Sequence, residues 1–388
     1  MSYIFTGDNP SQLYMDALKT ILEEGDNVAP RGKKILEIRP VIFEFTNPMH
    51  RVTFLKGRVI NPFFQLAESL WILLGRSDVA WLEPFNKSIG QFSDDSNYFN
   101  APYGERLRRW NSNDLHNFVF NPMDQLHDVF RKLKADKDSR QAVALIYNPI
   151  FDHSRVETLD RPCNLVLTFK IRDNKLDLTV FNRSNDLHWG LFGANLVQFS
   201  TILELMAVCL EVEVGCYYHI TDSLHVYLDD YGAAETDKIS SSYGGVARKN
   251  RKYVSEFYFQ NEPKMTSQFE FNLNRLADGL EEMVVRDTVL EANPSRMFSM
   301  LDSLVDPYAK LSVSAMLAYR TFKLGMLHEC VEALRRMPDC SWKISCLRFL
   351  QPALVTSEVS EDFINLYKGL PAEHQGYINR LDILKGDK

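Results

Sequence analysis

Residues 161–200 read RPCNLVLTFKIRDNKLDLTVFNRSNDLHWGLFGANLVQFS, and this stretch decides the fold. Residues 164–172 and 175–182 are rich in β-branched and apolar side chains, and the Asp-Asn pair between them is typical of a hairpin turn. Residues 195–210 are apolar nearly all round, which predicts a buried helix. The stretch therefore predicts a hairpin followed by a core helix, with a cysteine at the start of the first strand.

The chain before this stretch predicts further elements of both kinds. Residues 11–25 have helical apolar spacing and end at a glycine, whereas residues 35–59 and 140–150 have the composition of strands, the former as a pair. Residues 63–75 are apolar nearly all round and predict a second buried helix that carries one carboxylate, Glu68. A buried acid is costly unless it is paired or functional, so Glu68 needs a specific role.

The pattern of apolar and polar residues changes near residue 245. From about residue 262 the pattern is amphipathic and helical, with polar breaks between the segments. The predicted helices are 269–290, 296–304, 311–336 and 340–350. We therefore expect a catalytic domain over residues 1–245 and a mostly helical C-terminal extension over residues 246–388.

Composition narrows the class of protein. The chain has 388 residues, of which 45% are apolar and 12% aromatic, so a folded protein is expected. A net charge of −7 gives no global field for duplex nucleic acid, and no window is apolar enough for a membrane span. The six cysteines lack CxxC spacing, which argues against zinc or another metal site and against a disulfide framework. The expected location is the cytoplasm, or the host cytoplasm if the gene belongs to a phage.

Cys163 is the first candidate for chemistry. Taken alone, an intracellular cysteine is more often an inert buried thiol than a nucleophile. The context changes this, because Asn182-Arg183-Ser184-Asn185-Asp186 closes the hairpin and Asn195 opens the buried helix.

Residues 161–200 resemble the active-site stretch of the thymidylate synthase and deoxynucleotide hydroxymethylase family. In that family a Pro-Cys nucleophile precedes a hairpin, an Arg-Ser-x-Asp element and a helix that begins at Asn. The likeness extends over roughly residues 11–231. The other matching elements, in the order of the family, are Glu24-Gly25 with Arg31, Ala67-Glu68-Ser69-Leu70-Trp71 with Gly75, Tyr103-Gly104-Glu105-Arg106 to Trp110, Asp138-Ser139-Arg140, and His225-Val226-Tyr227.

The resemblance implies an α+β fold, in which helices flank a large mixed β-sheet, and an active homodimer. It also implies that 5,10-methylenetetrahydrofolate is the cosubstrate. The Cys163 thiolate would add to C6 of a pyrimidine nucleotide and turn C5 into a nucleophile. Arg183 would lower the pKa of the thiol, although an ordinary surface ion pair is the alternative for this arginine.

The resemblance assigns the remaining catalytic roles to four side chains. Glu68 and Asn195 would stabilise the enolate and relay protons, and Tyr103 would assist removal of the C5 proton. Asp186 would contact the folate ring. For Glu68 the alternative is a buried acid satisfied by the backbone, for Asn195 a helix N-cap, and for Tyr103 simple packing.

An arginine guanidinium binds phosphate well because it can donate two hydrogen bonds at once. The candidates for binding the nucleotide phosphate are Arg31, Arg140 and Arg183, with the hydroxyl of Ser184. By resemblance, Arg140 reaches into the site of the neighbouring subunit. His225 and Tyr227 lie at strand-like i, i+2 spacing, and they resemble the pair that binds the sugar 3′-hydroxyl. A structural histidine packed beside a core tyrosine is the alternative for that pair.

The base is expected to be uracil. In this family an Asn at the start of the second buried helix pairs with O4 and N3–H of uracil, whereas cytosine hydroxymethylases have Asp there. Counting back from Met206-Ala207 puts Asn195 in that place and requires one inserted residue after Gly190, whereas counting forward from Gly190 selects Ala194. We favour the register of the packed helix, because a loop tolerates an insertion more easily.

The sequence also departs from the family. Gln141 replaces a basic residue, Asn164 replaces a histidine after the nucleophile, and Gly90 stands where thymidylate synthases have a tryptophan over the methylene intermediate. The chain continues far beyond Tyr227 and ends in Lys385-Gly386-Asp387-Lys388 instead of a short apolar lid. A wetter site favours hydroxymethylation of deoxyuridylate over methylation. The alternatives are thymidylate synthase, deoxycytidylate hydroxymethylase and a non-catalytic nucleotide-binding scaffold.

Overall fold

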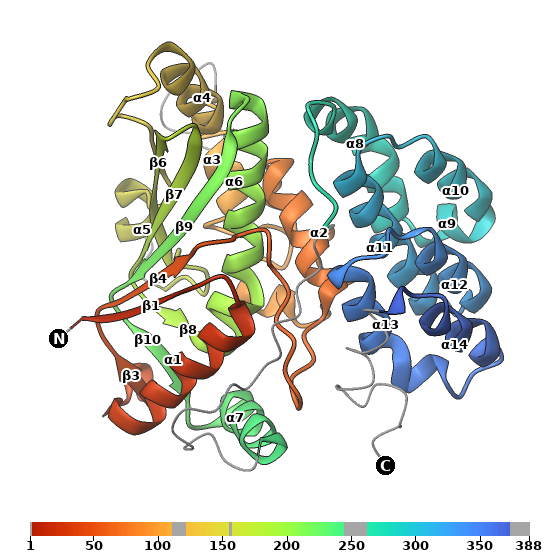
Figure 1. Ribbon diagram of the computed structural model, residues 1–388, viewed down its shortest axis with the longest axis horizontal. Helices are drawn as coiled ribbons and strands as arrows, with labels where there is room; N and C mark the ends of the chain where they lie inside the picture. The colour runs from red at the N-terminus through yellow and green to blue at the C-terminus, as the bar shows by residue number, and fades with distance from the viewer. Residues whose placement is uncertain (1, 111–121, 155–156, 244–261, 373–388) are drawn as a thin grey trace. The chain divides into compact units, whose positions relative to one another are not determined.

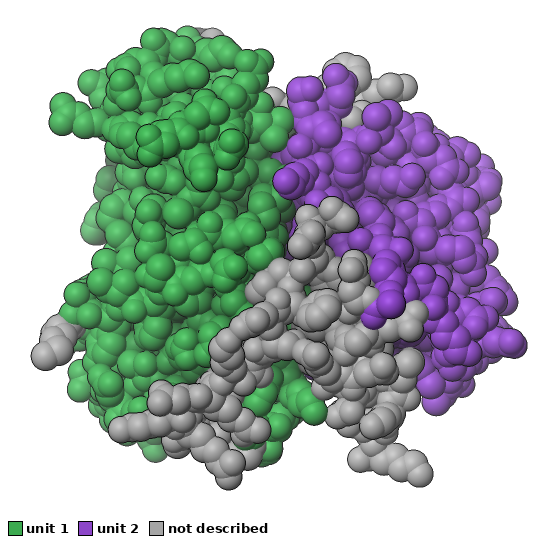
Figure 2. Space-filling view, in the orientation of Figure 1, with its two compact units in different colours: residues 1–58, 71–79, 90–256 green, residues 59–70, 80–89, 257–388 purple. Residues whose placement is uncertain are grey.

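The computed structural model describes residues 2–110, 122–154, 157–243 and 262–372. These residues form two compact units, which Figure 2 shows in different colours. Unit 1 comprises residues 1–58, 71–79 and 90–256, and unit 2 comprises residues 59–70, 80–89 and 257–388. The units thus differ from the two continuous domains expected from the sequence, because two short early segments group with the C-terminal helices.

Unit 1 contains a mixed sheet of six strands in the order β1-β4-β9-β7-β6-β5. Its strands are β1 (Tyr3–Gly7), β4 (Val41–Phe45), β9 (Glu213–Thr221), β7 (Lys175–Asn182), β6 (Asn164–Arg172) and β5 (Val143–Leu145). β1 pairs parallel with β4 and β7 parallel with β9, while the other neighbours are antiparallel. The predicted α+β fold with a large mixed sheet is therefore confirmed.

The β6–β7 hairpin forms as predicted. Asp173 and Asn174 both adopt left-handed backbone conformations, with φ of 49° and 59°, as a two-residue type I′ turn requires. Phe169 and Leu178 face each other in this hairpin and are fully buried. Cys163 immediately precedes β6, so the hairpin places the thiol where this strand of the sheet begins.

Unit 1 contains a second sheet, of four strands, which the sequence did not predict. It has the order β2-β3-β10-β8, with β2 (Asp26–Val28), β3 (Ile35–Ile38), β10 (Leu224–Tyr227) and β8 (Asn185–Asp186). The prediction that residues 35–59 form paired strands was wrong. β3 and β4 pair with partners in different sheets, and only an isolated bridge between Leu55 and Arg58 follows them.

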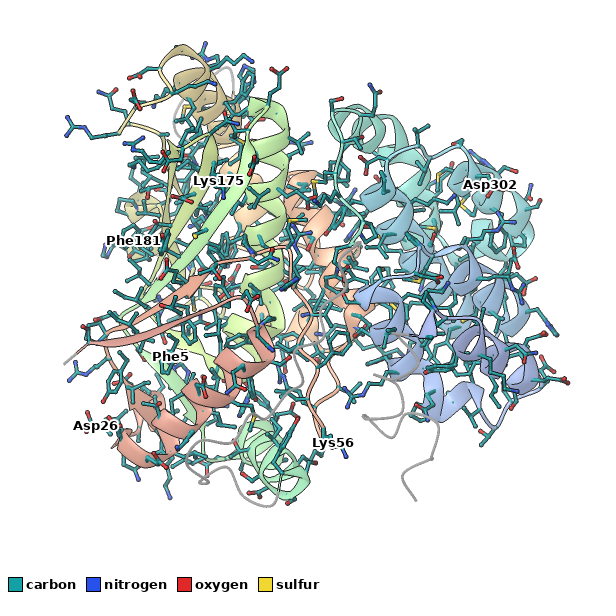
Figure 3. All side chains as sticks on the ribbon, viewed as in Figure 1. Phe5, Asp26, Lys56, Lys175, Phe181 and Asp302 are labelled. Atoms are coloured by element: carbon teal, nitrogen blue, oxygen red, sulfur yellow. The ribbon has the colours of Figure 1, made fainter. Side chains whose placement is uncertain are left out.

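Helices flank the large sheet of unit 1 (Figure 1). The helices in and around this unit are α1 (Pro10–Glu24), α2 (Pro62–Leu73, shared with unit 2), α3 (Tyr103–Arg108), α4 (Gln125–Ala135), α5 (Pro149–Ser154), α6 (Leu196–Leu210) and α7 (Asp230–Ser242). Side chains fill the space between the sheet and the helices of unit 1 (Figure 3). Among the aromatic ones, Phe43 stacks on Phe5, with ring centroids 5.0 Å apart, and meets Phe192 edge-on.

The predicted helices 11–25, 63–75 and 195–210 correspond to α1, α2 and α6. A π-helical segment, Leu187–Asn195, leads directly into α6. Together they are long and apolar enough to cross a membrane, but 94% of the most apolar window is buried inside the protein. Length and hydropathy therefore reflect a core helix in this part of the chain.

The described part of unit 2 is helical. Its C-terminal helices are α8 (Phe269–Val285), α9 (Asp287–Ala292), α10 (Pro294–Asp302), α11 (Pro307–Lys323), α12 (Leu327–Arg336), α13 (Ser341–Leu354) and α14 (Ser360–Lys368). The single helix predicted over residues 311–336 is broken, because Gly325 has a φ of 75° and ends α11. Phe63 and Phe85 stack on Tyr319 of α11, with ring centroids 4.9 and 5.7 Å apart, so the early segments share the core of unit 2.

Candidate active site

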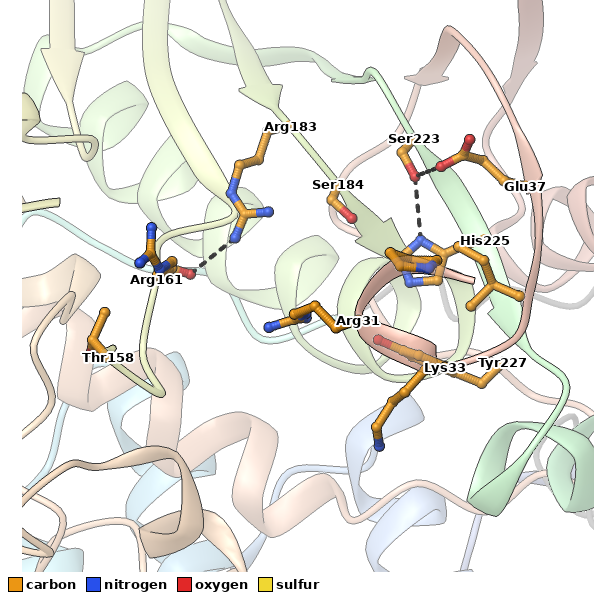
Figure 4. A pocket seen from close by; sticks show the side chains of 12 residues that line it. Arg31, Lys33, Glu37, Thr158, Arg161, Arg183, Ser184, Ser223, His225 and Tyr227 are labelled. Atoms are coloured by element: carbon orange, nitrogen blue, oxygen red, sulfur yellow. Dashed lines mark hydrogen bonds between the residues drawn. The ribbon is translucent and has the colours of Figure 1, made fainter. Parts of the chain in front are cut away.

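Unit 1 contains a pocket of about 560 Å³ (Figure 4). Its lining residues come from well-separated parts of the chain: Pro30, Arg31, Lys33, Ile35, Glu37, Thr158, Arg161, Arg183, Ser184, Ser223, His225 and Tyr227. Four of these side chains are cationic and one, Glu37, is acidic. Such a concentration of guanidinium and ammonium groups suits an anionic ligand, above all a phosphate.

The four-stranded sheet positions one wall of the pocket. In the antiparallel pair β3–β10, His225 lies opposite Glu37 and Tyr227 lies opposite Ile35. β8 pairs with the other side of β10 and sets Asp186 beside His225. The predicted His-x-Tyr pair therefore does point from one strand face into a pocket, as its i, i+2 spacing indicated.

Arg31 reaches the pocket from an unusual backbone conformation. It has a φ of 53° and a ψ of 30° within the short turn Pro30–Gly32. A left-handed conformation is costly for a residue with a long side chain, and such residues cluster at functional sites. The turn therefore supports a binding role for the predicted Arg31.

Arg183 connects the pocket to Cys163. Its Nε donates to the carbonyl of Pro162 at 2.9 Å, and one Nη lies 3.7 Å from the Cys163 Sγ. The same guanidinium approaches the carbonyl of Arg161 at 3.4 Å. Arg183 thus lines the pocket and at the same time contacts the loop that carries Cys163.

Burial raises the pKa of the Cys163 thiol above its ordinary value, Arg183 and Arg31 oppose this rise, and Asp160 adds to it. The sequence argument expected the arginines to lower the pKa, and they do act in that direction, but desolvation outweighs them in the free protein. The thiol is therefore protonated at neutral pH before substrate binds.

Tyr103 lies directly behind the nucleophile. Its hydroxyl accepts a hydrogen bond from the backbone N–H of Cys163 at 3.3 Å, and burial raises the pKa of the phenol. The ring stacks on Phe199 of α6. Tyr103 therefore combines the packing role with a position beside the reacting cysteine.

Ser223 lies between two polar side chains of the pocket, Glu37 and His225. Its hydroxyl donates to Glu37 and lies 3.5 Å from the Nδ1 of His225 (Figure 4). Burial lowers the pKa of His225, with Asp186 and Glu37 opposing, so the imidazole is neutral at physiological pH. The ring of His225 meets that of Tyr227 edge-on, with centroids 5.2 Å apart.

Asp186 does not line the pocket, but it is held tightly. Its carboxylate accepts from the backbone N–H groups of His188 and Trp189 at 3.2 and 2.7 Å, which caps the π-helical segment. The hydroxyl of Tyr231 donates to the same carboxylate at 2.5 Å. A folate ring that contacts Asp186 would have to bind beside the Tyr231 hydroxyl or displace it.

Asn195 is buried at the last position of the π-helical segment. The alternative role as a side-chain N-cap is wrong, because its backbone is already helical and its side chain makes no capping bond. Each turn of π-helix takes up one more residue than an i→i+4 turn. The segment can therefore accommodate the extra residue that the predicted register with Asn195, rather than Ala194, requires after Gly190.

Arg140 and Glu68 are not among the side chains that line the pocket described above. Arg140 is exposed on the loop between α4 and β5, next to Gln141, and does not line the pocket of its own chain. Glu68 is half-buried on the part of α2 that belongs to unit 2. Their catalytic and cross-subunit roles remain predictions, and the predicted chain end Lys385–Lys388 lies outside the described residues.

Sequence reasoning missed two cations in the pocket, Lys33 and Arg161. Each lies within two residues of a predicted site residue, Arg31 and Cys163, and that proximity was the available signal. It also missed Glu37, Thr158 and Ser223, whose positions depend on strand pairing and loop paths that no local motif reveals. No group of three or more metal-ligating side chains occurs within the described part of the chain.

A mixed sheet that sets a cysteine beside an arginine, next to a cationic pocket, has the arrangement that an enzyme with a thiol nucleophile and a phosphorylated substrate would need. The sequence signature of thymidylate synthase matches residues 12–291, and the chain belongs to the thymidylate synthase family. The resemblance found in the sequence is thereby confirmed.

Individual relatives agree with this assignment. The chain is 51% identical over 387 residues to deoxyuridylate hydroxymethyltransferase of Bacillus phage SP01, with 97% of this chain and 99% of the relative covered. It is 37% identical to the protein of the same name from Pseudomonas phage M6, over 56% of this chain and 58% of that one. A putative thymidylate synthase of Methanosarcina mazei is 36% identical over 41% of this chain and 69% of its own.

Proposed function

We propose that the protein transfers a one-carbon unit from 5,10-methylenetetrahydrofolate to C5 of deoxyuridylate and releases 5-hydroxymethyl-deoxyuridylate. The observation that carries this proposal is the 51% identity to the hydroxymethyltransferase of phage SP01 along nearly the whole of both chains. That match includes the helical unit, which the much shorter match to the archaeal relative cannot include in full.

The pocket supports nucleotide binding. Arg31, Arg161 and Arg183 would hold the phosphate, and Ser184 would add a hydroxyl donor. His225 and Tyr227 would bind the sugar hydroxyl at the wall formed by β10. Arg140 of a second subunit would complete the phosphate grip, so we propose a homodimer as the active form.

The chemistry begins at Cys163. Its thiol loses a proton to a base, the thiolate adds to C6 of uracil, and the electron pair of the C5–C6 double bond moves to C5 and O4 as an enolate. C5 attacks the methylene carbon of the folate, the C5 proton leaves to a base, and tetrahydrofolate departs to give an exocyclic methylene. Water then adds to that methylene while the thiolate leaves C6, which yields the hydroxymethyl product.

Three side chains would manage charge and protons during these steps. Asn195 would pair with O4 and N3–H, and Glu68 would relay protons through water. Tyr103, whose hydroxyl already contacts the loop of the nucleophile, would assist loss of the C5 proton. Asp186 would contact the folate ring.

Water reaches the intermediate because a side chain is missing at Gly90. A Cβ built there would meet only one atom within 4 Å, a methyl group of Val79 at 3.5 Å. If Gly90 lies beside the exocyclic methylene, as the family resemblance implies, the missing side chain would favour water addition over hydride transfer.

A second candidate is thymidylate synthesis, which the family match and the names of the archaeal relatives favour. The two reactions share every step up to the exocyclic methylene. They differ in the last step, because hydride transfer oxidises tetrahydrofolate to dihydrofolate and water addition does not.

The test is to incubate the protein with deoxyuridylate and methylenetetrahydrofolate, weigh the nucleotide and follow dihydrofolate absorbance. We expect a hydroxymethyl product without dihydrofolate. Stoichiometric dihydrofolate with a methyl product would replace the proposal by thymidylate synthesis. The Cys163→Ser variant is the control, since it should bind nucleotide and give neither product. In a separate experiment, covalent trapping of Cys163 by 5-fluoro-deoxyuridylate with methylenetetrahydrofolate would exclude a non-catalytic nucleotide-binding scaffold.

A further inference from the structure

Five buried polar side chains form a continuous hydrogen-bonded chain in the core of unit 1. Tyr217 Oη lies 2.7 Å from Nδ1 of His219, and Nε2 of His219 lies 2.6 Å from Nδ2 of Asn185. Asn185 Nδ2 also donates to Oδ1 of Asn195 at 3.1 Å, and Asn195 Nδ2 donates to Oε1 of Gln198 at 3.0 Å. We call this set the amide chain. No part of it lines the phosphate pocket.

The direction of each hydrogen bond follows from the imidazole. His219 is fully buried, and burial lowers its pKa to about 3, so the ring is neutral at physiological pH. A neutral imidazole has one donor and one acceptor nitrogen. Because the amide nitrogen of Asn185 can only donate, Nε2 of His219 accepts and Nδ1 donates to the hydroxyl of Tyr217.

Asn185 is also confined sterically. A Cβ added to Gly190 would lie 2.2 Å from the Asn185 Oδ1, far inside contact distance. The side chain of Asn185 is therefore enclosed between the backbone at Gly190 and the ring of His219. It keeps its oxygen toward the glycine and its nitrogen toward His219 and Asn195.

This arrangement decides which way Asn195 faces. An amide keeps its shape when its oxygen and nitrogen exchange places, so its neighbours set its orientation. A flipped Asn195 would set its nitrogen against the Asn185 nitrogen and its oxygen against the Gln198 oxygen. Two buried hydrogen bonds would be lost and two like groups would face each other.

We propose that Asn185 is a positioning residue that locks the amide of Asn195 in the orientation that accepts uracil and rejects cytosine. The proposal rests on the proposed function, in which Asn195 reads the base. Uracil offers an acceptor at O4 and a donor at N3, whereas cytosine offers a donor at N4 and an acceptor at N3. The locked amide presents an N–H to O4 and an oxygen to N3–H, and only a flipped amide matches cytosine.

The test is Asn185→Asp, which replaces the donor that faces Asn195 by an acceptor of the same shape. A flipped Asn195 can then donate to the introduced carboxylate and match cytosine. We expect the ratio of kcat/KM for deoxyuridylate over that for deoxycytidylate to fall at least about tenfold, since Asn185 supplies one of the two hydrogen bonds that favour the locked orientation. Equilibrium binding of both nucleotides in a Cys163→Ser background should show the same change in ratio.

Gln198→Glu is the matched control. It adds a buried carboxylate on the other side of Asn195, but Gln198 already accepts from Asn195, so the locked orientation and the preference for uracil should survive. An unchanged ratio in Asn185→Asp, or an equal fall in both variants, would overturn the proposal. If Asn185→Asp does not fold, Asn185→Leu must still weaken the preference for uracil.

The proposed function fails separately from this inference. A wild-type protein that converts neither nucleotide would refute the proposed function, yet the binding ratio in the Asn185 and Gln198 variants would still report on Asn195.

Discussion

At the residue scale, the nucleophile is not preactivated. Desolvation raises the pKa of the Cys163 thiol, and the opposing charge of Arg183 is shared with the carbonyls of Pro162 and Arg161. A thiolate therefore forms only as pH rises toward and beyond the ordinary pKa of a cysteine.

Removing Arg183 should make the thiol less reactive still. We expect Arg183→Gln to slow alkylation of Cys163 by iodoacetamide about three- to tenfold at neutral pH, and to move the midpoint of the rate profile to higher pH. The reason is that Arg183 lowers the pKa of the thiol and glutamine does not. The rate is followed by mass spectrometry of the Cys163 peptide between about pH 7 and 10, the range in which a thiol of ordinary or raised pKa titrates.

Arg172→Gln is the control for that experiment, because Arg172 is an arginine at the far end of β6, paired with Asp138. Its alkylation profile should match that of the wild type. Equal profiles in all three proteins would mean that Arg183 has no electrostatic influence on the nucleophile.

Individual residues were predictable where a local motif names them. Arg31, Arg183, Ser184, His225 and Tyr227 all line one pocket, as their motifs indicated. Lys33 and Arg161 were missed because the direction of a side chain in a turn depends on its backbone path. The amide chain could not be predicted from the sequence, since Asn185, Asn195 and His219 meet only when β8, the π-helical segment and β9 pack together.

At the element scale, composition located strands well and paired them less well. The β6–β7 hairpin followed from its turn residues, whose left-handed backbone is a local property. β3 and β4 were expected to pair because they are adjacent in sequence, yet they join different sheets. The partner of a strand depends on elements far along the chain, here β9 and β10.

The π-helical segment depends on one small residue. A Cβ at Gly190 would meet the Asn185 side chain at 2.2 Å, so Gly190→Ala must push that side chain or the segment aside. We expect this variant to lower the free energy of unfolding by about 1–3 kcal/mol, the usual cost of overpacking a core. Chemical denaturation followed by fluorescence measures the loss.

Gly7→Ala is the comparison for that prediction. A Cβ at Gly7 would meet Leu13 at 3.5 Å, which is an ordinary contact, so the free energy of unfolding should change by less than about 0.5 kcal/mol. Equal stability of the two variants would show that the segment adapts freely around position 190.

At the scale of the whole molecule, the C-terminal helices are more than an appendage. The rings of Phe63 and Phe85 are buried against Tyr319, and Asn61 donates to the carbonyl of Phe85 at 2.8 Å. The part of α2 that carries Glu68 therefore shares a core with helices far later in the chain. A change in composition along the chain predicts a single boundary in the sequence. It therefore cannot reveal a unit that is built from separate segments.

The last prediction concerns two copies of the chain. Arg140 is exposed and absent from the lining of its own pocket, which is what a residue donated to a partner requires. If the site is shared, Cys163→Ser and Arg140→Ala should each be inactive alone, yet mixing them should restore activity. One site of each heterodimer then combines an intact cysteine with an intact arginine, so random exchange restores about a quarter of wild-type activity. The control mixes Cys163→Ser with Arg183→Ala, where each defect lies in the site of its own chain and no heterodimer contains an intact site. Recovery in the first mixture alone would establish the shared site, whereas no recovery after verified subunit exchange would exclude the donation of Arg140 to the partner's site.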